Sequence, residues 1–452
     1  MTKQTGKELL LATLRHEPVD AVPWLPFAGV HAGKLKNYDA TEVLTDGDKL
    51  FESLLEVNRV YDPDGQPVLF DLQVEAEILG CDLVWAKKAP PSVATHPLAG
   101  DMTIPDRMPE KSDGRLPMIL DVMARMKQTV GEHTALYGLV CGPLTLASHL
   151  RGTEIFMDMM LNADPLHHLL AYTRDVTKRM IEFYVEAGMD VIAVVDPLVS
   201  QVGPRHFEQF LSEPFKDVFD HIRALGAFSS FFVCGDATKN IEIMCQTGPD
   251  SIGIDENINL MQAKAITDQY DVVMGGNIPL TTVMLMGTQQ DNMKFALDIV
   301  DSYSPHNLIL APGCDMPYDV PIENVIGIVE AIRDPERIRE VLKNYESPEL
   351  FDIDVELPDY DNLDCPLVEV FTLDSETCAA CTYMYGAAMR AVSELGTPVK
   401  IVEYKFTERE NVARCMKMGV TNLPSIYING QLKYSSIIPS NDELLAEIRR
   451  AI

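Results

Sequence analysis

Two cysteines and a pair of carboxylates each follow a short apolar run in the first three quarters of the chain. Cys234 follows FFV, Cys314 follows LILAPG, and Asp255-Glu256 follows SIGI. If these runs are parallel strands, their carboxyl ends meet at one edge of a sheet, and the side chains that follow them converge. Thiolates and a carboxylate at such an edge suit zinc and leave room for a substrate ligand. The alternative is that both cysteines are small buried core residues.

A second cysteine motif, Cys378-Ala-Ala-Cys381, lies near the C-terminus between a predicted strand and a predicted helix. At the first turn of a helix, the unpaired backbone N–H groups and the helix dipole stabilise a thiolate. We therefore predict that Cys378 and Cys381 form a catalytic redox pair. A structural disulfide and half of a metal site are the alternatives.

The first group of residues requires a fold that brings strand ends together. Over residues 1–345, short apolar runs alternate with longer helical segments, which is the pattern of a parallel α/β fold. Eight runs predict a (β/α)8 TIM-like barrel, with a doubly wound open sheet as the alternative. The predicted strands are Val22–Phe27, Asp82–Ala86, Ala135–Val140, Asp190–Asp196, Phe228–Cys234, Ser251–Asp255, Asp271–Gly275 and Leu308–Ala311.

The composition changes after the predicted barrel. Residues 346–366 contain eight acidic residues, three prolines and no lysine or arginine, which predicts an extended acidic linker. Residues 367–452 have the order strand, CxxC, helix, strand, helix, hairpin and helix, with Asn429-Gly430 at the hairpin turn. This order resembles a small thioredoxin-like α/β domain, a fold that carries a cis-proline at the position of Pro424.

The charge balance excludes several classes of partner. The 452 residues include 68 Asp and Glu against 37 Lys and Arg, a formal net charge of −31. Such a chain repels polyanions, so we expect no nucleic-acid partner and no docking on a membrane. No apolar run approaches the length of a membrane span, and the N-terminus does not resemble a signal peptide. Nine thinly spread cysteines do not form a disulfide scaffold, so we expect a cytoplasmic protein.

Residues 5–345 resemble the uroporphyrinogen decarboxylase-like superfamily, which includes zinc-dependent, corrinoid-linked methyltransferases. The segments that carry the resemblance are LRHEPVDAVPWLPFAGVH, FDLQVEAEILGC, YGLVCGPLTLASHLRG, EAGMDVIAVVDP, FFVCGDATKNIEIM, GGNIP and LILAPGCDMP. The resemblance implies a (β/α)8 barrel and, in the methyltransferase branch, a zinc site made by a His-x-Cys segment and a second cysteine.

The resemblance also assigns the metal ligands. Cys234 and Cys314 stand at the two cysteine positions, and Glu256 matches a glutamate of the related cobalamin-independent methionine synthases. The histidine position holds Phe232, so the chain would supply three ligands. Asp236 or the substrate would then complete the tetrahedron, or the metal is lost or weakly bound.

Charge separates the two branches of the superfamily. In the decarboxylase branch, the resemblance implies a cationic cavity for a substrate with many carboxylates, with an arginine-rich segment after the first strand. The matching stretch here, FAGVHAGKLKNY, contains no arginine, and none occurs between Arg15 and Arg59. Asp71 matches the cavity aspartate of the decarboxylase, but buried carboxylates without paired cations are costly. The methyltransferase branch is therefore favoured.

The resemblance implies a methyl transfer between a corrinoid protein and a thiol or folate acceptor. The chain has no D-x-H-x-x-G corrinoid-ligating motif, so a partner protein would carry the methylcorrinoid. Asp71 is predicted to contact substrate, as are His149 and Asp196, which follow the third and fourth strands.

Two other functions stay open. One is a lyase similar to uroporphyrinogen decarboxylase. The other is a non-catalytic ligand-binding barrel whose active part is the thioredoxin-like domain. In the methyltransferase, that domain would keep Cys234 and Cys314 reduced or reduce a disulfide form of the acceptor. Alternatively, Cys378 itself would present a thiol to the barrel, or the domain would only dock a partner protein.

Overall fold

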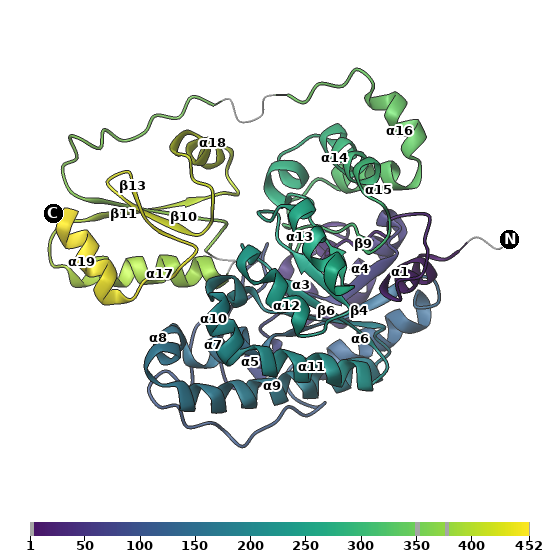
Figure 1. The fold of residues 1–452 in the computed structure, drawn as a ribbon, viewed down its shortest axis with the longest axis horizontal. Coiled ribbons are helices and arrows are strands. Elements are labelled where there is room, and N and C mark those ends of the chain that lie inside the picture. Colours follow the sequence, from purple (N-terminus) through teal and green to yellow (C-terminus); the bar gives the residue numbers. More distant parts are fainter. Residues whose placement is uncertain (1–3, 349–352, 376–378, 452) are drawn as a thin grey trace. The chain divides into compact units, whose positions relative to one another are not determined.

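The chain forms two compact units, the first ending at Ser347 and the second beginning at Pro348 (Figure 1). The computed structural model describes residues 4–348, 353–375 and 379–451. The predicted catalytic residue Cys378 lies outside these described residues. Among the described helices, none is both long enough and apolar enough to cross a lipid bilayer.

A curled parallel sheet of seven strands forms the centre of the first unit, in the order β1-β4-β5-β6-β7-β8-β9. The segment 22–27 closes the ring, because Leu25 N donates to Leu310 O at 2.9 Å and Asp64 N donates to Trp24 O at 2.9 Å. The predicted (β/α)8 barrel is thus confirmed. The seven strands are β1 (Gly65–Leu69), β4 (Ala135–Cys141), β5 (Val191–Val195), β6 (Phe228–Val233), β7 (Ser251–Ile254), β8 (Val273–Gly275) and β9 (Leu308–Ile309).

One predicted strand is wrong, and one real strand is missing from the prediction. The run Asp82–Ala86 contributes only β2 (Leu83–Val84), which pairs with β3 (Ser92–Val93) outside the barrel sheet. The barrel strand in this part of the chain is β1, whose glycine and proline are typical of turns. Gly65 is needed there for close packing, because an added Cβ atom would lie 2.6 Å from Leu10 Cδ1.

Helices pack around the sheet in the first unit (Figure 1). The segments 205–225 and 321–344 each form two helices, and in the second segment the new helix starts at Pro335, which lacks an N–H. The helices are α1 (Gly6–Leu14), α2 (His31–Lys34), α3 (Ala40–Thr45), α4 (Gly47–Tyr61), α5 (Val74–Ile78), α6 (Leu116–Thr129), α7 (Pro143–Arg151), α8 (Glu154–Leu161), α9 (Ala163–Glu186), α10 (Pro204–Phe210), α11 (Ser212–Ala224), α12 (Ile241–Gln246), α13 (Leu260–Thr267), α14 (Gln289–Ser302), α15 (Ile322–Arg333) and α16 (Pro335–Leu342).

Alternate strand residues fill the inside of the barrel with apolar side chains. On β6, Phe232 packs inward with Phe27, whereas the neighbouring Phe231 faces α10 and α11 with its ring centroid 4.3 Å from that of Phe215. This alternation follows from the two-residue period of a strand. Side chains at the carboxyl ends of the strands therefore lie on a packed apolar floor.

The second unit is a four-stranded sheet in the order β11-β10-β12-β13 with helices on both faces. Asn429 and Gly430 both have positive φ, 49° and 74°, which confirms the predicted hairpin turn. The Leu423-Pro424 peptide bond is cis, as the thioredoxin resemblance implies. The elements are β10 (Leu367–Thr372), α17 (Ala379–Glu394), β11 (Lys400–Lys405), α18 (Arg409–Met418), β12 (Ser425–Ile428), β13 (Gln431–Ser435) and α19 (Asn441–Ala451).

Part of the predicted acidic linker is packed against the second unit. Residues 353–366 contain no helix or strand. The Tyr360 hydroxyl nevertheless donates to Glu369 at 3.0 Å, and Lys417 Nζ donates to Val355 O at 2.7 Å. The second half of the linker is therefore anchored to the second unit.

Candidate active site

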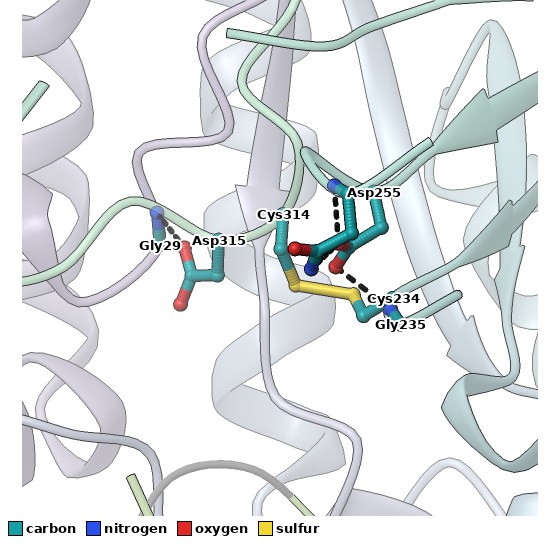
Figure 2. The surroundings of a disulfide bond; sticks show 7 residues. Gly29, Cys234, Gly235, Asp255, Cys314 and Asp315 are labelled. Atoms are coloured by element: carbon teal, nitrogen blue, oxygen red, sulfur yellow. Dashed lines mark hydrogen bonds between the residues drawn. A yellow bond between two sulfur atoms is a disulfide. The ribbon is translucent and has the colours of Figure 1, made fainter. Parts of the chain in front are cut away.

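Cys234 and Cys314 meet at the carboxyl-end mouth of the barrel, where their sulfur atoms form a disulfide bond (Figure 2). Cys234 directly follows β6, and Cys314 follows β9 after four intervening residues. Their Cα atoms are 5.8 Å apart, although 80 positions separate them in sequence. Both side chains are partly exposed and pack on the apolar floor of the barrel. The two predicted thiolate ligands are thus neighbours, while metal binding itself stays a prediction.

The third predicted ligand, Glu256, lies against the segment that carries Cys314. Gly313 packs so closely on Glu256 that a Cβ atom at position 313 would lie 2.5 Å from Glu256 N. The carboxylate accepts a hydrogen bond from Leu280 N, the first residue of a π-helix (Leu280–Leu285). Burial, assisted by the charge of Asp255, raises the pKa of Glu256 to about 8. A cation beside this carboxyl would favour its ionised form.

Two aspartates hold the loops that carry the cysteines (Figure 2). Asp255 accepts a hydrogen bond from Gly235 N at 2.7 Å, and Asp315 accepts one from Gly29 N at 2.8 Å. Burial raises the pKa of both carboxyls above the ordinary range. The sequence pointed to Asp255 as a strand-end carboxylate. The sequence analysis did not select Asp315, and the only feature that could have indicated it is its position directly after Cys314.

Phe232 occupies the position where the resemblance places a histidine ligand. Its side chain is 1% exposed, its ring stacks on Phe27 with centroids 4.7 Å apart, and it covers Gly253, where an added Cβ would lie 2.6 Å from the ring. No three His, Cys, Asp or Glu side chains within residues 4–348, 353–375 and 379–451 are arranged to hold a metal ion. Because the disulfide uses both sulfur atoms, the donor set fits zinc only after that bond is reduced.

Asp71 forms a buried ion pair that sequence reasoning missed. Its side chain is inaccessible to solvent, and Arg115 Nη1 donates to it at 2.7 Å. The same guanidinium binds Glu77 through Nε at 2.7 Å and stacks over the ring of Trp85. Arg115 lies in the segment before α6, 44 positions from Asp71 in sequence, so no local sequence pattern predicts the contact. One cation shared by two carboxylates does not make the cationic substrate cavity that the decarboxylase branch implies.

Asp196 and His149 both belong to the packing around α7. Asp196 is fully buried and accepts hydrogen bonds from Leu144 N (2.9 Å) and from both the N–H and the hydroxyl of Thr145. It therefore caps α7 and fixes that helix to the end of β5. Burial lowers the pKa of His149 to about 3, so its imidazole is neutral. These contacts give Asp196 a positioning role, and contact of either side chain with substrate stays a prediction.

In the second unit, Cys381 lies in the first turn of α17 and is 1% exposed. Its sulfur accepts a hydrogen bond from Leu373 N at 3.4 Å, at the end of β10. The position of Cys381 in the first turn of the helix after β10 agrees with the sequence interpretation. The redox role of Cys378 and Cys381 stays a prediction.

Comparison with known proteins gives two family matches. Residues 5–335 match the family described as uroporphyrinogen decarboxylase (URO-D), and residues 367–449 match the thioredoxin domain. Methylcobamide:CoM methyltransferase MtbA of Methanosarcina acetivorans is 26% identical over 342 residues, 74% of this chain and 99% of the relative. A uroporphyrinogen decarboxylase of a Wolbachia strain from Drosophila simulans is 25% identical over 348 residues, 73% of this chain and 99% of the relative.

Solved structures support the same barrel fold. A methyltransferase from Methanosarcina mazei superimposes with a TM-score of 0.68 at 24% identity, covering 74% of this chain and 99% of its own. A B12-independent methionine synthase from Shewanella sp. W3-18-1 gives a TM-score of 0.50 at 10% identity, covering 72% and 100%. These likenesses concern the fold of the first unit.

Proposed function

We propose a function from one premise, which is that this chain belongs to the uroporphyrinogen decarboxylase (URO-D) family. Within this family, the chain acts as a methyltransferase that moves a methyl group between a corrinoid carried by a partner protein and a small thiol. The observation that carries the proposal is the meeting of Cys234 and Cys314 at the barrel mouth. Relatives named methylcobamide:CoM methyltransferases, matched over 98% or more of their length, support it.

Cys234, Cys314 and Glu256 are the residues that would hold zinc in the reduced protein. Two sulfur atoms close enough to bond to each other are close enough to share one cation. Glu256, whose backbone packs against Gly313 of the segment that carries Cys314, would supply the oxygen donor. The metal would supply one chemical property, which is to lower the pKa of a bound thiol so that it stays a nucleophilic thiolate. The acceptor thiol would take the ligand position that Phe232 leaves open.

The protein's own residues position the reactants and exclude water. Phe232 and Phe27 close the barrel below the cysteines, so the acceptor meets water only at the mouth. Asp255 and Asp315 fix the two cysteine-bearing loops through backbone N–H groups. Rigid loops lower the entropic cost of aligning the acceptor sulfur in line with the methyl group. Folate is the other acceptor class that the sequence left open.

A decarboxylase is the second candidate, favoured by the buried Asp71 and by the relatives that carry that name. The charge of the site argues against it. Arg115 is already neutralised by Asp71 and Glu77, so it offers no net positive charge to a substrate with several carboxylates. Thus the methyltransferase remains the better-supported proposal.

The proposal is tested by supplying the reduced full-length chain with methylcobalamin and a panel of thiols. Demethylation of the corrinoid is followed optically, and the methylated thiol is identified by mass. We expect transfer with at least one thiol, its loss in Cys314→Ser, and its retention in Cys245→Ser, a buried cysteine away from the mouth. No transfer to any thiol, with decarboxylation of a porphyrinogen instead, would support the second candidate.

A further inference from the structure

One buried histidine follows the first barrel strand and has no part in the proposed chemistry. His31 begins α2, shortly after the segment 22–27 that closes the barrel ring, and it is inaccessible to solvent. Both ring nitrogens have partners, because Nδ1 lies 3.1 Å from Tyr318 O and Nε2 lies 2.7 Å from Tyr61 Oη. A buried polar side chain is stable only when its polar atoms are paired. These two contacts therefore define what the residue can do.

The two partners fix the tautomer of the imidazole. A carbonyl oxygen only accepts hydrogen bonds, so Nδ1 carries the hydrogen and donates it to Tyr318 O. Burial lowers the pKa of His31 to about 4, so the ring is neutral and Nε2 accepts from the Tyr61 hydroxyl. Tyr61 is itself fully buried and is the last residue of α4. His31 thus bridges α4 to one backbone carbonyl.

That carbonyl belongs to residues 314–320, which we call the Cys314 loop. Further hydrogen bonds join this loop to the segment 27–34, which contains His31. They run from Met316 N to Phe27 O (2.8 Å), from Gly29 N to Asp315 Oδ1 (2.8 Å), and from Lys34 Nζ to the carbonyl oxygens of Asp319 (2.7 Å) and Val320 (2.9 Å). The segment 27–34 and the Cys314 loop are therefore joined along their length, and His31 fastens the pair to α4.

Cys234 has a separate support. It directly follows β6, and the loop after it is held by the hydrogen bond from Gly235 N to Asp255. The separation of the two sulfur atoms in the reduced protein therefore depends on how firmly the Cys314 loop is held to the rest of the barrel. Groups that orient a ligand from outside the site affect metal affinity almost as strongly as the ligands do.

We propose that His31 is a positioning residue that holds Cys314 opposite Cys234 through its hydrogen bond to Tyr318 O. The consequence for zinc and methyl transfer rests on the proposed function, whereas the positioning of the two sulfur atoms does not. Loss of the bond leaves a buried carbonyl oxygen unpaired, which favours movement of the loop toward water.

Two amide substitutions separate this role from a general contribution to stability. Asparagine carries an amide at the distance of Nδ1 from the backbone, and glutamine carries one at the distance of Nε2. His31→Asn therefore keeps a donor for Tyr318 O, whereas His31→Gln keeps a group that faces Tyr61 instead. Both variants lose the ring that stacks on Tyr61 with centroids 5.9 Å apart. They differ in the one bond that the proposal requires.

The test equilibrates the full-length chain with glutathione buffers and measures the fraction of Cys234–Cys314 disulfide by peptide mass mapping. This fraction gives the effective concentration of one mouth thiol toward the other. We expect His31→Gln to lower it on the order of 10-fold, and His31→Asn to stay near wild type. A chelating dye should show the same order of zinc affinities in the reduced chains, with a loss on the order of 10-fold in His31→Gln.

Two more variants guard against misfolding and against unspecific loss of stability. Lys34→Met removes other bonds to the same loop from a partly exposed side chain, so it should shift both measurements in the same direction as His31→Gln. Asn58→Ala is the matched control on α4, because it removes hydrogen bonds to Gln66 and Thr134 at the amino ends of β1 and β4. It should lower stability in urea and leave both mouth measurements unchanged.

An unchanged effective concentration in folded His31→Gln or in Lys34→Met overturns the proposal. Equal losses in His31→Asn and His31→Gln, or the same loss in Asn58→Ala, overturn it as well, because the effect would then be one of general stability. The proposed function fails separately. The expected thiol shifts in a chain that binds no zinc refute the metal site and leave the positioning role standing, whereas zinc binding and methyl transfer without those shifts refute the positioning role alone.

Discussion

Replacing Phe232 by histidine restores the histidine ligand that the family resemblance implies, as a fourth protein ligand beside Cys234, Cys314 and Glu256. The phenyl ring lies inside the barrel, stacked on Phe27 and covering Gly253, in the same apolar cluster against which both mouth cysteines pack. Imidazole is smaller than phenyl, so it fits this space without moving Gly253. The Phe232→His variant should therefore bind zinc more tightly in its reduced form.

The size of the effect follows from what one ligand contributes. A four-ligand zinc site is worth about 10–16 kcal/mol at neutral pH, which is about 3 kcal/mol per ligand. Since about 1.4 kcal/mol is a factor of ten, the added imidazole should raise affinity on the order of 100-fold. The free energy of unfolding of the metal-free protein should fall by about 1–3 kcal/mol, because the stacking on Phe27 and part of the packing are lost.

The assay is competition with a chelating dye on the reduced chain, with free thiols counted in the same sample. Phe231→His is the matched control, because Phe231 is buried on the same strand but faces α10 and α11. It should lower stability without changing zinc affinity. Equal affinity in Phe232→His and wild type, or an equal gain in Phe231→His, would refute the assignment of this position to the metal site.

Three further predictions concern the rest of the barrel. Burial raises the pKa of Glu75 from 4.5 to about 7, so the folded chain retains a proton that the unfolded chain loses, and stability should fall by up to about 3 kcal/mol as the pH rises across that window. Urea unfolding at about pH 5 and about pH 8 measures this loss, and in Glu75→Gln the difference in the free energy of unfolding between the two pH values should be smaller. An equal difference in Glu75→Gln and wild type would contradict the prediction. Arg115→Gln leaves Asp71 buried without its cation, which should cost about 3–5 kcal/mol in urea unfolding; a loss that Asp71→Asn does not relieve in the double variant would show that the pair is not its cause. Gly313→Ala forces the cysteine loop away from the predicted glutamate ligand and should weaken zinc binding on the order of 10-fold, while Gly203→Ala, which meets open space, should leave zinc binding unchanged.

The sequence was most informative where burial dictates composition. Strands such as Val191–Val195 are apolar throughout because both faces are covered, and their ends located the mouth cysteines. The same rule failed at β1, where Gly65 and Pro67 break the apolar run, and the packing that requires Gly65 is revealed only by the neighbouring side chains. Asp82–Ala86 shows the opposite error, since an apolar stretch forms a short hairpin outside the barrel.

Long-range contacts set the limit for the site. Spacing relative to strand ends was enough to bring Cys234 and Cys314 together as candidates. Nothing in the sequence showed that Arg115 pairs with Asp71, or that Asp315 holds Gly29, because these partners belong to different elements. Asp196 was selected by its place after β5, and the sequence did not show that its carboxylate is buried and hydrogen-bonded to the first turn of α7.

The central claim is that thiolates at the barrel mouth hold a zinc ion that activates a thiol for methyl transfer. It is tested most directly by stripping the reduced full-length chain with a chelator, adding zinc back, and measuring methyl transfer from methylcobalamin to thiol at each step. The account predicts loss on stripping, recovery with zinc in wild type, and no recovery in Cys234→Ser. Equal transfer in the stripped and reloaded wild type, or recovery in Cys234→Ser, would contradict it.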